Sequence, residues 1–421
     1  MTKHMLLLMV CCVFHAQAQD TLHFRDCVEA AAGYAPRLLD EELIDAQGQM
    51  KLENAKRSWY PELTLNGKAT YQSDVVSIQI DQPGLTLDFP DMPHEQFGLN
   101  MDISQVIYDG GRSKSQRAYE MASTAVAIQE VQVDLHALKQ QVSGIYFSIL
   151  MLQANSENMA IALENLHVRE KVLRSAVENG VAEDADLKVI QVEIMKTEQS
   201  LSELDARRMG AVSALSVYMG ADLDEAVILE EPQLELTRSD SLHRPELKYF
   251  RLSSELLDAG KELHQVKRLP KFFAFGQAGI GMPGYNMLND QVDSYYMIGA
   301  GVQWNIWDWN VVNREQQILT KQQQVLEHSQ ETFSIQVQAG IERELAHMEH
   351  YRNALEMDDN MLQMRMEITE TAASKVDHGV ISATEYLQVL NEEKLARIAR
   401  AGHHIRLLQS LANYHLLKGT L

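Results

Sequence analysis

The sequence predicts a mixed, mostly α-helical fold, in which a long coiled-coil helical barrel continues a transmembrane β-barrel with four strands per chain. Three observations predict it. A long segment of the 421-residue chain is repeated in its second half. Two stretches follow coiled-coil spacing over lengths far beyond an average helix. Several segments of about ten residues alternate apolar and polar side chains, as tilted membrane strands do.

The repeat relates Gly180–Gly220 to Gly379–Gly419 without a gap. The same shift of 199 residues brings Asp109 onto Asp308. A duplication of this length, with helices and strands in one order, indicates two halves of one structure. We therefore expect a first structural repeat over 19–220 and a second over 221–421.

Residues 1–18 have the pattern of an export signal peptide. Lys3 gives a short charged start, Met5–Phe14 is apolar, and Ala16-Gln17-Ala18 is a small-residue cleavage site. Lipid attachment at Cys11 or Cys12 is not expected, because the apolar run before them is short and no small residue precedes either. No other segment has the roughly 20 apolar residues of a membrane helix.

The helices dominate the rest of the chain. Arg112–Glu178 contains no proline, and a matching stretch begins at about Val311. Shorter helices are expected near Phe24–Arg57, Asp184–Met219, Leu242–Arg268 and Thr384–Lys418. The helices at Phe24–Arg57 and Asp184–Met219 together are about as long as the first long helix, so they can stack end to end beside it. The other two short helices match the second long helix approximately in the same way. Apolar residues mark the seam of the first long helix at Ile128, Val131, Leu135, Leu138, Val142, Ile145 and Ile149.

Strands are expected at Pro61–Tyr71, Phe97–Ile103, Lys271–Gly281 and Tyr296–Ile306, with turn-rich loops at 81–94 and 282–294. Four strands cannot close a barrel, and lipid does not tolerate open sheet edges. A trimer would supply twelve strands. Aromatic residues near the strand ends suit a membrane interface: Tyr71, Tyr108, Tyr295, Trp304, Trp307 and Trp309.

Several motifs resemble the TolC-type outer-membrane efflux protein family. They are "AKRSWYPELTLNG" at a helix-to-strand entry, "QVIYDGGR" at a strand-to-helix junction, "DHGVISATEYLQVLNEE" at a helix-turn-helix tip and the closing "LLKGTL". The resemblance implies a homotrimer in the outer membrane, with twelve strands in lipid and twelve helices in the periplasm. It implies an exit duct for efflux or type I secretion, opened by an inner-membrane pump and a periplasmic adaptor.

The resemblance also marks the junctions. Asp109, Gly110 and Gly111 match the family's strand-to-helix junction. The second copy keeps Asp308 but has Trp309 and Asn310 in place of the two glycines, which leaves its turn geometry open.

The two tips carry the candidate gate. Gly180 and Gly379 are expected to end the long helices, because glycine permits the left-handed conformation there. Ser382 and Glu385 form a capping-box pattern, and Asp184 is a suitable N-cap.

By resemblance, Glu385 and Asp186 stand where an acidic residue lines the closed periplasmic constriction, and Gln388 stands where a second acid is usual. Whether Glu385 gates or only caps its helix stays open. Apolar tip residues that could contact the adaptor are Val181, Ala182, Val380 and Ile381, beside Gly180 and Gly379.

Composition argues against other classes of function. A net charge of −22 is unfavourable for binding nucleic acid. The Gly279–Gly284 glycine pattern contains Pro283 and opens no helix, so it is not a dinucleotide site. A single Glu344-x-x-His347 lacks the partner motif of a di-iron site. We expect no catalytic activity, no cofactor and no resident metal.

The rival hypothesis is a periplasmic or surface coiled-coil scaffold without a pore. It explains the heptads and the signal peptide, but not the alternating strands with their terminal aromatic residues. The sequence does not identify the exported substrate or the class of pump.

Overall fold

The computed structural model describes residues 21–76, 79–82, 85–88, 92–236, 241–286 and 291–421, so the expected signal peptide at 1–18, with Cys11 and Cys12, lies outside the described residues. The chain forms two compact units, each built from both halves of the sequence. The helical unit comprises Met1–Leu39, Val131–Pro245 and Thr332–Leu421, and the sheet unit comprises Asp40–Glu130 and Glu246–Glu331.

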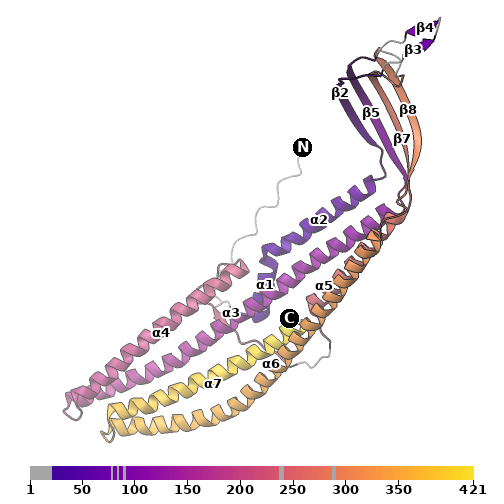
Figure 1. Cartoon of the computed structure of the whole chain (residues 1–421). Helices are drawn as coiled ribbons and strands as arrows, with labels where there is room; N and C mark the ends of the chain where they lie inside the picture. Colours follow the sequence, from indigo (N-terminus) through magenta and orange to yellow (C-terminus); the bar gives the residue numbers. More distant parts are fainter. Residues whose placement is uncertain (1–20, 77–78, 83–84, 89–91, 237–240, 287–290) are drawn as a thin grey trace, which may run out of the picture. The chain divides into compact units, whose positions relative to one another are not determined.

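Two antiparallel helical hairpins make up most of the helical unit (Figure 1). In the first, α3 (Arg112–Glu178) turns into α4 (Asp184–Met219), and in the second, α6 (Val311–Asp377) turns into α7 (Ala383–Lys418). These bounds confirm the long helices and the return helices that the heptad spacing predicts. The 67-residue α3 and α6 also extend into the sheet unit.

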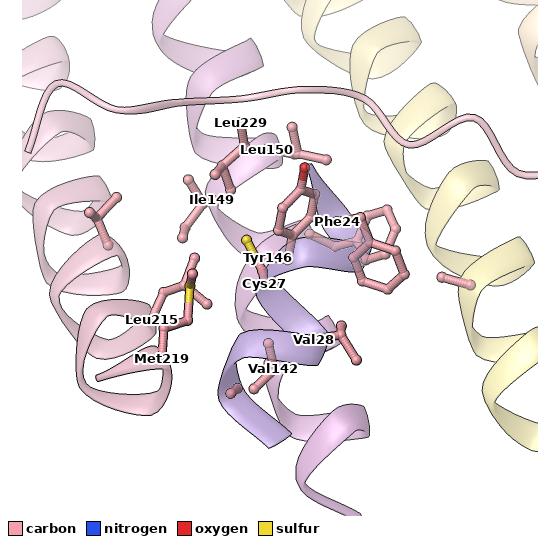
Figure 2. Close-up of a cluster of buried hydrophobic side chains, with 14 of the residues drawn as sticks. Phe24, Cys27, Val28, Val142, Tyr146, Ile149, Leu150, Leu215, Met219 and Leu229 are labelled. Carbon is pink, nitrogen blue, oxygen red and sulfur yellow. The ribbon is translucent and has the colours of Figure 1, made fainter. Parts of the chain in front are cut away.

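One core of the helical unit packs the short helix α1 (Phe24–Tyr34) against α3 and α4 (Figure 2). Phe24 and Tyr146 pack edge to face at 5.2 Å, and Cys27 is fully buried beside them. Burial raises the pKa of the Cys27 thiol to about 12. The short parallel strands β1 (Thr21–Leu22) and β6 (Ile228–Leu229) border this core, and the Tyr146 hydroxyl lies 2.6 Å from the Glu230 carbonyl oxygen. The core thus ties both ends of the first half to α3.

A second core, the tip core, lies near the turns of the two hairpins and takes side chains from all four of their helices. The two hairpins therefore share buried apolar surface, which stabilises their association. Its buried members are Leu166, Leu173, Ile190, Ile194, Ala372, Val376, Ala383, Tyr386 and Leu390.

The sheet unit contains a four-stranded antiparallel sheet in the order β2 (Glu62–Tyr71), β5 (Glu95–Tyr108), β7 (Lys271–Met282) and β8 (Asp293–Gln303). The central pair joins the two halves of the sequence, with Asp102 opposite Gln277. In the single chain β2 and β8 are the edges of this sheet. One face is apolar and open, and Leu65 on it is 65% exposed and Ile298 81% exposed.

Two further helices accompany the long helices within the sheet unit. Most of α2 (Pro36–Arg57) runs beside α3, where a Cβ on Gly48 would lie 2.5 Å from Oγ1 of Thr124. Helix α5 (Pro245–Gln265), followed by a 3-10 turn at Val266–Arg268, runs beside α6, with Gly260 at the contact. Each glycine lets two helix backbones approach closely.

Three predicted bounds were wrong. The helix expected over Phe24–Arg57 is interrupted at Ala35, because Pro36 disfavours the helical conformation of the residue before it. The strand expected to reach Ile306 ends at Gln303, opposite Lys271, since Pro270 has no N–H to continue the ladder. The loop at 81–94 includes parts of a two-stranded hairpin, β3 (Gln79–Gln82) and β4 (Leu85–Asp88).

Strand β5 passes into α3 through a turn that Asp109 organises. Its carboxylate accepts hydrogen bonds from the backbone N–H of Gly111 at 2.8 Å and of Ser113 at 2.7 Å. Burial opposes ionisation, but these bonds and the one from the Ser113 hydroxyl outweigh it and hold the pKa of Asp109 below its ordinary value. Gly110 and Gly111 both have positive φ, at 69° and 88°.

The junction before α6 has the same geometry without the glycines. Asp308 accepts from the backbone N–H of Asn310 at 2.9 Å and of Val312 at 3.0 Å, and these bonds lower the pKa of Asp308. Trp309 and Asn310 take φ values of 52° and 65°, in the left-handed region that glycine occupies in the first copy. Asparagine tolerates this region, whereas a bulky residue there is strained. The backbone hydrogen bonds that the Asp308 carboxylate accepts therefore hold Trp309 in an unfavourable backbone conformation.

The two junctions predict opposite responses to substitution. Gly110→Ala should destabilise the protein by about 1 to 3 kcal/mol, because alanine disfavours positive φ. In addition, a Cβ at position 110 would lie 2.7 Å from Cβ of Leu269. Trp309→Gly, at the equivalent place in the second copy, should be neutral or stabilising by up to about 1 kcal/mol, because glycine adopts positive φ without strain. Urea unfolding followed by circular dichroism measures both, and equal destabilisation by the two variants would contradict the shared geometry.

Candidate functional site

The turns at the two hairpin tips are built alike. In the first, the N–H of Gly180 bonds to the carbonyl of Val177 at 3.0 Å, and that of Val181 to Ala176 at 2.8 Å. The second repeats this pattern from Gly379 and Val380. Both glycines have positive φ, at 71° and 68°, so each long helix ends in a Schellman motif. The predicted role of the two glycines is confirmed.

The helices that leave the turns begin differently. Ser382 and Glu385 form the predicted capping box at the start of α7: the Ser382 N–H donates to Glu385 Oε2 at 2.9 Å, and Glu385 N–H donates to Ser382 Oγ at 3.3 Å. The prediction of Asp184 as N-cap was wrong. Glu183 occupies the N-cap of α4 without a side-chain bond, and Asp184, one residue inside the helix, pairs with Lys188 at 2.7 Å.

Glu385 keeps its charge in this arrangement. The bonds from the Ser382 backbone and hydroxyl hold the pKa of Glu385 below its ordinary value. The side chain is also exposed at the tip surface, as is Gln388 one turn further along α7. The capping bonds therefore leave the Glu385 carboxylate exposed, so this residue can cap α7 and face solvent at the same time.

Asp186, the equivalent of Glu385 in the first copy, has a different environment. It is half-buried, and its Oδ1 accepts a hydrogen bond of 3.3 Å from the backbone N–H of Ala383, the first residue of α7. A carboxylate is favourable at this helix N-terminus because the backbone N–H groups there lack partners within the helix. Asp186 thus connects the first hairpin to the second within one chain.

Arg169 makes a second connection, which the sequence reasoning missed. Its guanidinium, on α3, forms an ion pair with Asp377 at the end of α6 and donates to the Ala373 carbonyl at 3.2 Å. It also lies 5.8 Å from the ring centroid of the buried Tyr386 on α7. Burial is the main cause that raises the pKa of Tyr386, so its hydroxyl stays protonated at neutral pH. We call Arg169, Asp377 and Tyr386 the tip latch. No local sequence signal identifies it, because its partners are about 200 residues apart.

The four apolar tip residues separate into two pairs. Val181 and Val380, each just after its glycine, are 75% and 68% exposed. Ala182 and Ile381, one position further on, are half-buried and pack against the tip core. The exposed apolar surface of the tips is therefore carried by the two valines.

Within the described residues, no helix combines the length and the apolar character needed to cross a membrane.

Part of the chain matches a known protein family. Residues 35–221 match the family model described as outer membrane efflux protein. No curated protein shows significant sequence similarity to the chain.

Solved structures match over nearly the whole chain. The outer membrane protein VceC of Vibrio cholerae is 16% identical, with a TM-score of 0.68 over 94% of this chain and 96% of its own. The CmeC outer membrane channel of Campylobacter jejuni is 14% identical, with a TM-score of 0.69 over 94% of this chain and 85% of its own. The MtrE outer membrane channel of Neisseria gonorrhoeae, in its open state, is 15% identical, with a TM-score of 0.68 over 94% and 88%.

At these identities the structural matches show the fold alone. The family model covers residues 35–221, which is less than half of the 421-residue chain.

Proposed function

We propose that three copies of this chain form the outer-membrane exit duct of an efflux or type I secretion system, a passive channel without catalysis of its own. The observation that supports the duct most directly is the sheet. Four antiparallel strands present one continuous apolar face, and two Asp-capped turns lead from them into the two longest helices.

The open edges of that sheet support a closed assembly of several copies, which we take to be a trimer. In lipid the backbone groups of β2 and β8 that face away from the sheet would lack hydrogen-bond partners. Each such unsatisfied group in hydrocarbon costs on the order of several kcal/mol. Pairing β2 of one copy with β8 of the next removes both edges. Three copies then give twelve strands, and the long and stacked short helices give twelve helical positions around the periplasmic part.

The hairpin tips would form the periplasmic gate of this duct. In a trimer the exposed Glu385 would recur three times around the axis, and like charges held close repel each other and attract cations. The latch from Arg169 and the bond from Asp186 to Ala383 keep the two hairpins of each chain together. Opening would require the hairpins to separate or shift, so these contacts would stabilise the closed state.

Adaptor docking would use the exposed apolar tip residues Val181 and Val380. An inner-membrane pump, reached through the adaptor, would then provide the driving energy, since nothing in the described part of the chain suggests an energy-consuming site.

The duct is tested by planar-bilayer recording of the detergent-purified protein. We expect stable K⁺ conductance, because a closed barrel needs a water-filled lumen if it is to export solutes. Protein that is released from membranes by carbonate without detergent, and gives no current, would favour a scaffold without a pore.

The latch is tested by Arg169→Ala. Loss of a hydrogen-bonded ion pair of this kind costs about 1 to 3 kcal/mol, and each 1.4 kcal/mol shifts a two-state equilibrium about tenfold. We expect roughly a tenfold rise in open probability. Arg174→Ala is the matched control, because Arg174 pairs with Glu170 on its own helix and not across the hairpins. A similar rise in both variants would refute a latch between the hairpins.

Capping and gating by Glu385 are separated by two variants. Glu385→Gln keeps a residue that can complete the capping box but removes the charge, whereas Glu385→Ala removes both. If the three Glu385 carboxylates of the trimer act as a gate, Glu385→Gln should weaken Mg²⁺ block of K⁺ current several-fold without loss of helix stability. Because the pKa of Glu385 is lowered, wild-type block should persist as pH falls to about 5 and be lost only below the ordinary pKa of glutamate. Unchanged block in Glu385→Gln would leave this residue with its capping role alone.

A further inference from the structure

The two faces of the four-stranded sheet differ in chemistry. The face opposite the open apolar one carries Asn66, Asn100, Asp102 and Gln277, which the strand register places side by side. If three copies close a barrel with the apolar face toward lipid, this polar face lines the lumen. The inference that follows therefore rests on the proposed duct.

Asp102 is the centre of a hydrogen-bonded network on this face. Its Oδ2 accepts from the side-chain amides of Asn66 and Asn100, each at 2.6 Å, and its Oδ1 accepts from Gln277 at 2.7 Å. The three donors come from β2, β5 and β7, and they fix the carboxylate in place. They also occupy three of its about four lone-pair sites, which makes it a poor ligand for a bare metal ion.

Aromatic rings on β7 and β8 lie on the same face of the sheet as this carboxylate. Phe275 is directly opposite Gly299, and Tyr295 is directly opposite Gly279. A Cβ on Gly299 would lie 2.5 Å from Cζ of Phe275, and one on Gly279 would lie 2.9 Å from Cζ of Tyr295. Each ring therefore covers the space above a glycine of the neighbouring strand.

The segment after β7 adds a third ring to the same place. Tyr285 packs against Tyr295 with ring centroids 4.3 Å apart, and its hydroxyl donates to Oε1 of Gln277 at 2.7 Å. Gln277 in turn donates to Asp102, so the network runs without a break from this segment to β2. Lower on the same face Lys271 lies 6.0 Å from the ring of Phe273, which shows a cation already placed against this wall.

We propose that Asp102, Phe275 and Tyr295 form a binding station for organic cations in the lumen, which transported quaternary or aromatic amines occupy on their way out. A carboxylate whose oxygens already accept three hydrogen bonds is better suited to attract the diffuse charge of an organic cation than to coordinate a metal ion directly. The exposed faces of aromatic rings carry negative potential and favour the same class of ligand. The exported substrates of this duct would accordingly include amphipathic cations.

Block of K⁺ current by tetraethylammonium tests this station in planar bilayers. Asp102→Asn should raise the half-blocking concentration about tenfold, and Phe275→Leu about threefold, as expected for loss of a charge and of one cation–π contact. Asp293→Asn is the matched control, because Asp293 shares this face of the sheet at the far end of β8, beside Gly281. It should change the block less than twofold.

The outcomes separate the station from the duct. Retained K⁺ conductance in each variant shows that the pore has folded. Wild-type K⁺ current with equal tetraethylammonium block in Asp102→Asn would overturn the station alone, and so would an equal change in Asp293→Asn, which would indicate only a general negative field. No K⁺ current from the wild-type protein would overturn the duct, and the station with it.

Discussion

In the proposed duct every backbone N–H and C=O of a strand in lipid must be hydrogen-bonded, and this requirement constrains the rest of the assembly. One chain provides four strands, and the register between β5 and β7 joins its two halves in the middle of the sheet. In the proposed duct the unpaired sides of β2 and β8 would be satisfied by other copies. Closure by three copies would bring three pairs of hairpins into one ring, so a gate at the tips and a lined lumen both follow from the same pairing.

The duplicated halves show how different sequences reach one geometry. Asp109 and Asp308 cap the long helices with the same pair of backbone bonds, yet one turn uses two glycines and the other uses Trp309 and Asn310 at positive φ. At the tips the halves differ in the contacts of the equivalent acidic residues rather than in turn geometry. The two glycine turns match, but Asp186 bonds to the neighbouring hairpin whereas Glu385 caps its own helix and stays exposed. Of the two equivalent acidic residues, only Glu385 in the second copy is exposed to solvent.

Much of the fold could be predicted, because short-range patterns in the sequence determine its helices, strands and turns. Heptad spacing marked both long helices, alternation marked the four strands, and glycine with Ser382 and Glu385 marked the tips. The break at Ala35 was also local, and the effect of Pro36 could have been anticipated. The end of β8 depended on Pro270 in its partner strand, which only the register reveals. The tip latch and the network around Asp102 join residues far apart in sequence, and no local pattern carries that information.

The most direct measurement of the central claim is a cryo-electron microscopy map of the purified protein in lipid nanodiscs. The account predicts three-fold symmetry and a closed twelve-stranded barrel, in which β2 of each copy pairs with β8 of the next and the Asp102 face points inward. A map in which the sheet remains open, or in which the apolar face of β2 and β8 is turned toward the lumen, would contradict it.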